Sequence, residues 1–162
     1  MHFYKQLSDA DLGTKLPADV HRAANEAAVL AGKELGIGAV RLIWFEKVLD
    51  GTHFDFKSAT PILGEARPRF EPGIVRVLLT DNKEQAVSVV AHETMHLAQF
   101  ARGGYADAKG IRAELEAGRF EGTFATRFFG RKVENWASGS YAKSRAMDEL
   151  KNDLAALELA LQ

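Results

Sequence analysis

Apolar residues recur along this chain with two different spacings, and each spacing predicts one type of element. Stretches with an apolar residue every three to four positions are typical of helices, and we expect them at 17–35, 81–103, 107–129 and 141–161. Runs rich in β-branched and aromatic residues are typical of strands, and we expect them at 39–45, 53–57 and 73–80. Residues 58–73 hold three of the four prolines and predict a loop.

Polar residues and glycines mark the expected ends of these helices. Asp81, with Glu84 three residues later, forms a capping-box pattern that predicts the start of the 81–103 helix. Gly103 and Gly104 predict its end, because glycine is the residue most often found just after a helix. Asp107 is expected to be the N-cap of the following helix.

Strands set among longer helices, without an internal repeat or linker, predict a single α+β domain over residues 1–162. We expect a small mixed sheet of about three strands, packed on the 81–103 helix, which is apolar nearly all round and therefore buried. Residues 1–16 are polar and irregular and predict an N-terminal arm. Residues 130–162 predict a helical C-terminal extension.

Composition narrows the class of protein. Hydrophobic residues make up 46% and charged residues 27% of the 162 positions, which is typical of globular chains and excludes fibrous and disordered classes. A formal net charge of −1 predicts no strong attraction to nucleic acid or to an anionic membrane. The absence of cysteine excludes disulfides, thiolate zinc sites and a cysteine nucleophile. No apolar run has the length of a signal peptide or a membrane span, so we expect a cytoplasmic protein.

A His-Glu-x-x-His pattern lies in the middle of the 81–103 helix. His92 and His96 are one helical turn apart and about 40° apart around the axis, so two neutral imidazoles can share one Zn²⁺. Glu93 points about 100° away from His92, which suits a general base that takes a proton from a zinc-activated water better than a third ligand. Burying two histidines requires partners for them, and a hydrogen-bonded pair of core histidines is the alternative.

The 107–129 helix carries three glutamates, which differ in the helix face they occupy. Glu114 and Glu121 lie between two apolar arcs and point into the protein, whereas Glu116 lies among arginines on a solvated face. An inward carboxylate needs a cation or a proton. We therefore expect Glu114 to be the third zinc ligand and Glu121 to accept a hydrogen bond from a ligating histidine. An ion pair between Glu114 and a buried arginine is the alternative.

The order of these features resembles a known group of enzymes. A strong strand, then His92-Glu93-x-x-His96, then Glu114-x-x-Ala117 is similar to the gluzincin zinc metallopeptidases. The segment 114–120 is especially similar to ImmA/IrrE-type and phage-associated metallopeptidases. The resemblance covers roughly residues 74–129. It implies a zincin-like fold, a zinc cofactor, a peptide or protein substrate, and Glu114 as the third ligand.

The resemblance also implies that the strand before the metal-binding helix lies at the sheet edge, where an extended peptide can pair with it. The chain departs from the pattern at Gly118, where the family has Asp or Asn, so the carboxylate expected beside a zinc-binding histidine is missing unless Glu121 supplies it. The metzincin pattern fails, because Gln99 and Arg102 stand where its glycine and third histidine belong. An aspzincin-like ligand at Asp107 is less favoured than a helix cap.

Two classes of function compete. The first is a zinc-dependent peptidase, with Tyr105, Tyr141 or Arg102 as candidate donors to the oxyanion. The second is a non-catalytic or regulatory zinc-binding module, kept open by the missing side chain at Gly118. Such a module could associate with DNA through residues 127–145, where five basic residues accompany Trp136 and Tyr141.

Overall fold

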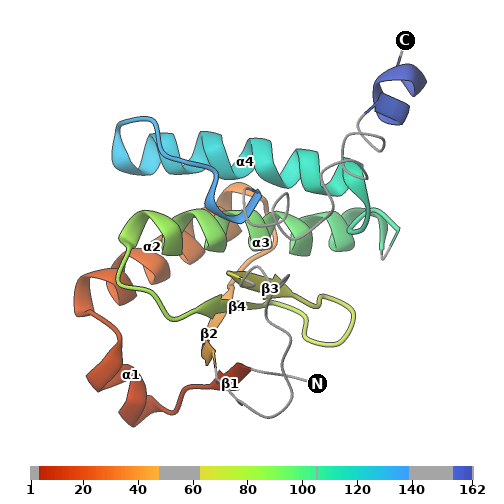
Figure 1. Cartoon of the computed structure of the whole chain (residues 1–162). Coiled ribbons are helices and arrows are strands. Elements are labelled where there is room, and N and C mark those ends of the chain that lie inside the picture. The colour runs from red at the N-terminus through yellow and green to blue at the C-terminus, as the bar shows by residue number, and fades with distance from the viewer. Residues whose placement is uncertain (1–3, 48–62, 105, 139–154, 162) are drawn as a thin grey trace, which may run out of the picture.

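The computed structural model describes residues 4–47, 63–104, 106–138 and 155–161 (Figure 1). Its elements follow in chain order: β1 (Tyr4–Gln6), α1 (Asp9–Lys15), α2 (Ala18–Glu34), β2 (Arg41–Lys47), β3 (Gly64–Ala66), β4 (Ile74–Leu78), α3 (Lys83–Gly103) and α4 (Ile111–Phe129). Residues 155–160 are also helical and form part of the helix expected at 141–161. The chain is therefore of mixed α and β structure, as its apolar spacing predicts.

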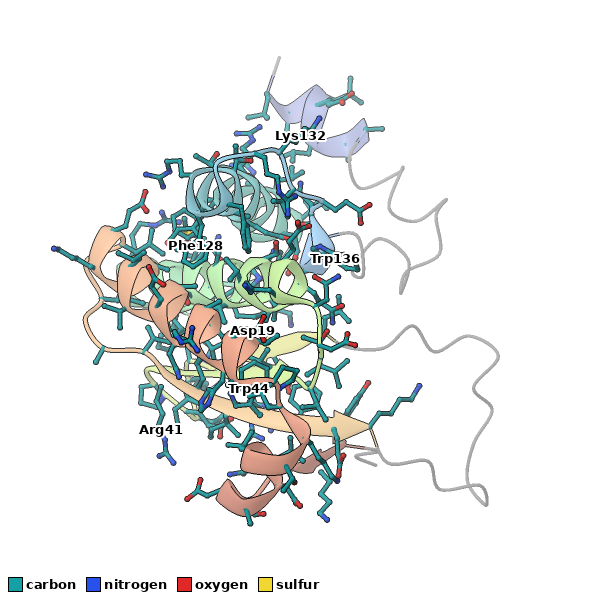
Figure 2. All side chains as sticks on the ribbon, turned by 90° about the vertical axis from the view of Figure 1, so that its left-hand side faces the viewer. Asp19, Arg41, Trp44, Phe128, Lys132 and Trp136 are labelled. Carbon is teal, nitrogen blue, oxygen red and sulfur yellow. The ribbon has the colours of Figure 1, made fainter. Side chains whose placement is uncertain are left out.

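The strands form one mixed sheet in the order β1-β2-β4-β3. β2 and β4 are parallel, with Arg41 opposite Ile74, and β1 and β3 run antiparallel to them at the two edges. The β2–β4 pair forms the apolar centre of the sheet. Trp44 of β2 is 2% exposed and points toward α2, where its ring centroid lies 6.3 Å from that of His21 (Figure 2).

α3 is the central helix of the molecule. It contacts β3 and β4 on one side, α2 and α4 on others, and lies between the sheet and α4 (Figure 1). Its three valines, together with Ala86 and Ala91, are fully buried, which explains an apolar surface that extends nearly all round the helix. Polar side chains of α3 therefore face other parts of the protein, and each needs a partner there.

The ends of the helices differ from those predicted. Asn82, not Asp81, is the N-cap of α3, and its side chain accepts a hydrogen bond from the Gln85 amide at 3.1 Å. Glu84 does not close a capping box but pairs with Arg131. α4 begins at Ile111, so Asp107 is not its cap. The chain must change direction between α3 and α4, and α4 therefore begins about one turn later than expected.

Two regions predicted to be irregular contain strands or helix. Residues 4–16, which the sequence predicts to be irregular, form β1 and α1 and bury Leu7 and Leu16. The predicted loop at 58–73 includes the strand β3. Elements of three to seven residues are too short for a clear apolar period, and β3 contains no β-branched residue.

The predicted strand at 73–80 is confirmed as β4, but the prediction that it lies at a sheet edge is wrong. β4 lies between β2 and β3, and β3 occupies the edge. The strand expected at 53–57 lies outside the described residues. Within the described ranges, no helix combines the length and the apolarity needed to cross a membrane.

Candidate metal centre

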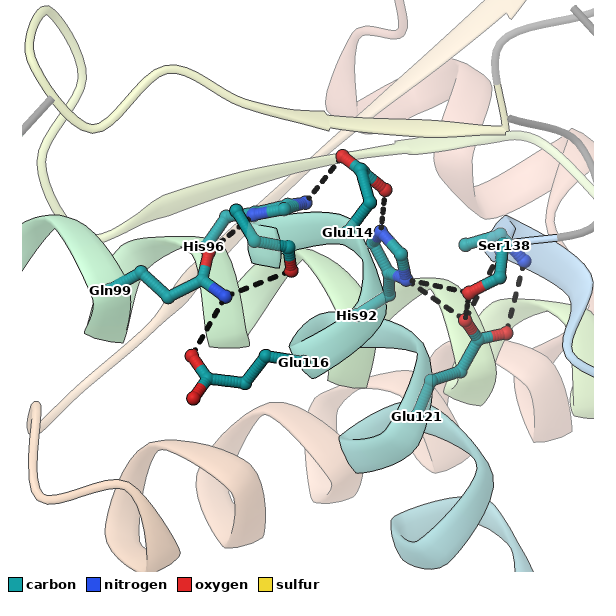
Figure 3. Close-up of polar contacts among 9 residues, drawn as sticks. His92, His96, Gln99, Glu114, Glu116, Glu121 and Ser138 are labelled. Atoms are coloured by element: carbon teal, nitrogen blue, oxygen red, sulfur yellow. Dashed lines mark hydrogen bonds and ion pairs between the residues drawn. The ribbon is translucent and has the colours of Figure 1, made fainter. Parts of the chain in front are cut away.

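Two histidines of α3 and one glutamate of α4 converge in the layer between these helices (Figure 3). His92 and His96 are buried, and their ring centroids are 4.9 Å apart. The Glu114 carboxylate spans them, with Oε2 3.1 Å from His92 Nε2 and Oε1 3.1 Å from His96 Nε2. The helical period that puts both rings on one face of α3 thus directs both Nε2 atoms toward α4.

The arrangement matches the donor set of a three-ligand zinc site. One nitrogen from each histidine and one oxygen of Glu114 all lie within 4.8 Å of one another. Two imidazoles and a carboxylate are ligands that zinc accepts, and three protein ligands leave a position open for water or substrate. Among the described residues, Glu114 pairs with the two histidines and with no arginine, so the part of the chain that the structure describes does not contain the alternative arginine pair. Among the described residues, the cluster of possible metal ligands does not include Asp107.

The Nδ1 atom of His92 faces a second carboxylate. Glu121 Oε1 lies 2.9 Å from it, and the Glu121 side chain is fully buried. Glu121 also accepts hydrogen bonds from the backbone amides of Ala137 and Ser138 at 3.0 and 3.2 Å. The contact expected between Glu121 and a histidine is therefore present, although the family pattern would place that carboxylate at Gly118.

His96 has a different partner, which the sequence did not reveal. Its Nδ1 lies 2.7 Å from Gln99 Oε1, and Gln99 Nε2 donates to the Ala113 carbonyl and to Glu116 Oε1, both at 2.9 Å. Gln99 is fully buried, so its amide is oriented by these contacts. The available signal was its position three residues after His96, which makes the two side chains neighbours on the surface of α3.

Glu116 lies partly in solvent, as expected, but it also contacts a residue of the cluster's surroundings. Its side chain is 42% exposed, but it accepts a hydrogen bond from Gln99 and pairs with Arg102 at 2.9 Å. Arg102, a candidate oxyanion donor, is thus engaged away from the cluster. The other two candidate donors, Tyr105 and Tyr141, lie outside the described residues.

Charge in the cluster favours a bound cation. Burial opposes protonation of His92, but the hydrogen bonds that its ring donates to Glu114 and Glu121 outweigh this effect and raise its pKa to about 10. Burial also opposes a charged His96, yet the carboxylates of Glu114 and Glu93 raise its pKa. The two histidines in turn lower the pKa of Glu114 to about 2, against the effect of its burial. Protons supply the positive charge here without a metal, and a metal ion would displace them.

Glu93 occupies a separate position beside β3. It is buried on α3, and burial raises its pKa. β3 crosses so close that a Cβ added at Gly64 would lie 3.3 Å from Glu93 Cγ and 2.2 Å from Val89 Cγ1. Only glycine permits this approach, which brings an edge strand alongside the carboxylate.

The basic region expected at 127–145 is partly neutralised where it is described. Arg127 pairs with Glu34 of α2, and Arg131 pairs with Glu84 of α3. Surface pairs of this kind tie α4 and the following segment to the neighbouring helices. Lys132 is exposed, and residues 139–145, which hold Lys143 and Arg145, lie outside the described ranges.

Comparisons of the chain with models of known protein families, with curated proteins and with solved structures found no match. Its function must therefore be inferred from the chemistry of the cluster on α3 and α4.

Proposed function

We propose that the chain is a zinc-dependent peptidase with a zincin-like fold, similar to the gluzincins. His92, His96 and Glu114 would bind the ion, and Glu93 would act as the general base. The observation that carries the proposal is the cluster itself: three ligand atoms within 4.8 Å of one another, beside a buried carboxylate that is not one of them.

The side chains around the cluster support neutral, oriented imidazoles. Gln99 Oε1 and Glu121 Oε1 can each accept the Nδ1 proton of one histidine, which leaves Nε2 as the ligand atom. This assignment agrees with the direction of both Nε2 atoms toward Glu114. The regulatory alternative rested on a missing carboxylate at Gly118, and the contact from Glu121 supplies that group from one helical turn further on.

A bound zinc ion lowers the pKa of a coordinated water and polarises a substrate carbonyl. Glu93 would accept a proton from the attacking water as the carbon–oxygen bond forms. It would then deliver that proton to the amine nitrogen as the carbon–nitrogen bond breaks. The raised pKa of Glu93, caused by its burial, brings the carboxylate closer to the range in which it both accepts and releases protons near neutral pH.

β3 is the element best placed to hold a substrate. In the described part of the chain it pairs with β4 alone, so its other edge has backbone N–H and C=O groups for an extended peptide. At Gly64 the face of this strand lies close to Glu93, so the edge is near the proposed base. A substrate peptide that pairs with β3 would be held near Glu93 by main-chain hydrogen bonds. Such binding places few requirements on the side chains of the peptide. β3 would thus take the role that the resemblance implies for the strand before the metal-binding helix.

Glu93→Gln tests the proposal, because it keeps the size of the side chain and removes the base. We expect the variant to retain zinc while cleavage of a peptide library made from whole-cell protein falls by about 100-fold or more. Zinc content is measured by elemental mass spectrometry, and cleavage by sequencing of the new peptide ends. A wild-type protein that holds zinc but cleaves no more than the variant would favour the non-catalytic zinc-binding module.

A further inference from the structure

Gly118 and Ser138 share a space beside the candidate zinc site. Gly118 is on α4, one turn after Glu114, and Ser138 is far along the chain in the segment that follows α4. A Cβ added at Gly118 would lie 2.7 Å from Ser138 Oγ and 3.5 Å from Ser138 Cβ. The first distance is too short for a carbon–oxygen contact, so a side chain at 118 and the hydroxyl of Ser138 exclude each other.

Ser138 uses this space to reach Glu121. Its hydroxyl donates to Glu121 Oε1 at 3.0 Å, and its backbone amide donates to the same oxygen at 3.2 Å. The hydroxyl also lies 3.4 Å from His92 Nδ1 (Figure 3). The Ala137 amide donates to the other Glu121 oxygen at 3.0 Å. The segment around Ser138 therefore determines which way a fully buried carboxylate faces.

This segment is itself held in the core. Val133 and Ala137 are 6% and 7% exposed, and Ala137 packs in the main apolar cluster. A carboxylate oriented by several donors can fix the ring of the histidine that it faces, which raises the affinity of that histidine for a metal. Without Glu121, the polar contacts of the His92 ring among the described residues would be Glu114 at 3.1 Å and the Ser138 hydroxyl at 3.4 Å.

We propose that Ser138 is a positioning residue of the zinc site, holding Glu121 so that Glu121 orients His92 and replacing a side chain that Gly118 lacks. The inference rests on the proposed zinc binding. With this role for Ser138, the segment 133–138 belongs to the zinc site, although it contributes no ligand atom. Zinc affinity then depends on contacts made well after the sequence pattern that carries the histidines and Glu114.

A double-mutant cycle tests this link. Ser138→Ala removes the hydroxyl, and Gly118→Ala pushes it away, so each change should weaken zinc binding by about tenfold. The double variant should bind zinc no more weakly than Ser138→Ala, because the added methyl group then meets no hydroxyl. Affinities are measured by competition with a coloured chelator. Ser88→Ala is the control: Ser88 is a buried serine of α3, and its hydroxyl has no hydrogen-bond partner among the described residues.

Two further measurements separate positioning from general stability. The visible spectrum of the cobalt-loaded protein, which reports ligand geometry, should change in Ser138→Ala and stay unchanged in Ser88→Ala. Gly118→Ala in the Ser138→Ala background should raise the melting temperature of the metal-free protein, because alanine favours helix over glycine. Stability would thus rise without any recovery of zinc affinity.

The outcomes distinguish this inference from the proposed function. If the wild type binds zinc and the variants bind it equally well with unchanged cobalt spectra, the role of Ser138 is wrong while zinc binding stands. Additive losses in the double variant would also overturn it, because they would show that the two positions act independently. A wild-type protein that binds no zinc would overturn the proposed function itself and this inference with it. If Gly118→Ala does not fold, Ser138→Ala and its cobalt spectrum still decide the question.

Discussion

At the scale of single residues, the two glutamates at the start of α4 have distinct roles. Glu114 touches both histidines directly, whereas Glu116 reaches His96 only through the amide of Gln99. Two glutamates only two positions apart therefore differ in their distance from the site: Glu114 contacts the histidines, and Glu116 contacts only a neighbour of one histidine. A direct ligand and a residue behind it should differ in their effect on metal binding.

Alanine substitutions should distinguish the proposed ligands from the residues behind them by their effect on zinc affinity. Alanine at His92, His96 or Glu114 should abolish stoichiometric zinc binding, because two remaining ligands do not form a stable site. Gln99→Ala should weaken binding by about 10- to 100-fold, because His96 loses its orienting partner. Glu116→Ala should cost less than Gln99→Ala, since the Ala113 carbonyl still holds the Gln99 amide. Titration with zinc and a competing chelator gives each affinity.

The reverse order of zinc affinities would refute the assignment of Glu114 as a ligand and Glu116 as a residue behind it. A protein that loses zinc in Glu116→Ala and retains it in Glu114→Ala would place the ligand on the other face of α4.

At the scale of elements, the close approach of β3 to α3 positions Glu93. β3 has only three residues, and its glycine lies against Val89 and Glu93. Short edge strands are held mainly by contacts of this kind, because they contribute few hydrogen bonds of their own. Any side chain at position 64 must therefore separate the strand from the helix or displace Glu93.

Gly64→Ala should reveal this contact. The added carbon would lie 2.2 Å from Val89 Cγ1, so we expect a loss of about 1–3 kcal/mol in the free energy of unfolding. Peptide cleavage should fall even where the protein remains folded, since β3 and Glu93 would move apart. Denaturant unfolding and a cleavage assay measure the two effects. Gly13→Ala on α1 is the control, because a Cβ there would meet nothing within 4 Å. Equal stability of the two variants would show that β3 does not approach α3 so closely.

At the scale of the whole molecule, the candidate site joins parts of the chain that are distant in sequence. α3, α4 and the segment 133–138 all contribute side chains or amides to it. A metal ion bound only by the folded protein stabilises that fold in proportion to the logarithm of its concentration over Kd. The histidines and carboxylates of the site would otherwise share protons in a buried environment.

Removal of zinc should therefore lower the melting temperature. At free zinc of about 100 times Kd the stabilisation is about 2.7 kcal/mol, which corresponds to a shift on the order of 5–10 °C for a chain of this size. Differential scanning calorimetry with and without a chelator measures the shift. His96→Ala should show no dependence on zinc. A wild-type melting temperature that ignores the chelator would contradict a zinc site in the folded core.

The sequence by itself determined the features that depend on the helical period. His92 and His96 share one face of α3 because they are one turn apart, and the apolar arcs of α4 place Glu114 on the inward side. The main helices and the central strands follow from the same local patterns. These predictions need no knowledge of how elements pack, because each is a property of one continuous segment.

Only the tertiary structure decided which segments meet. The order of strands puts β3, and not β4, at the edge beside Glu93, and no local pattern encodes the order in a sheet. The contacts of Gln99 with Glu116 and of Ser138 with Glu121 join residues 17 positions apart in each case. Hydrogen bonds over such separations depend on how helices and following segments are packed together. The outer contacts of the candidate site therefore became visible only once the chain was folded.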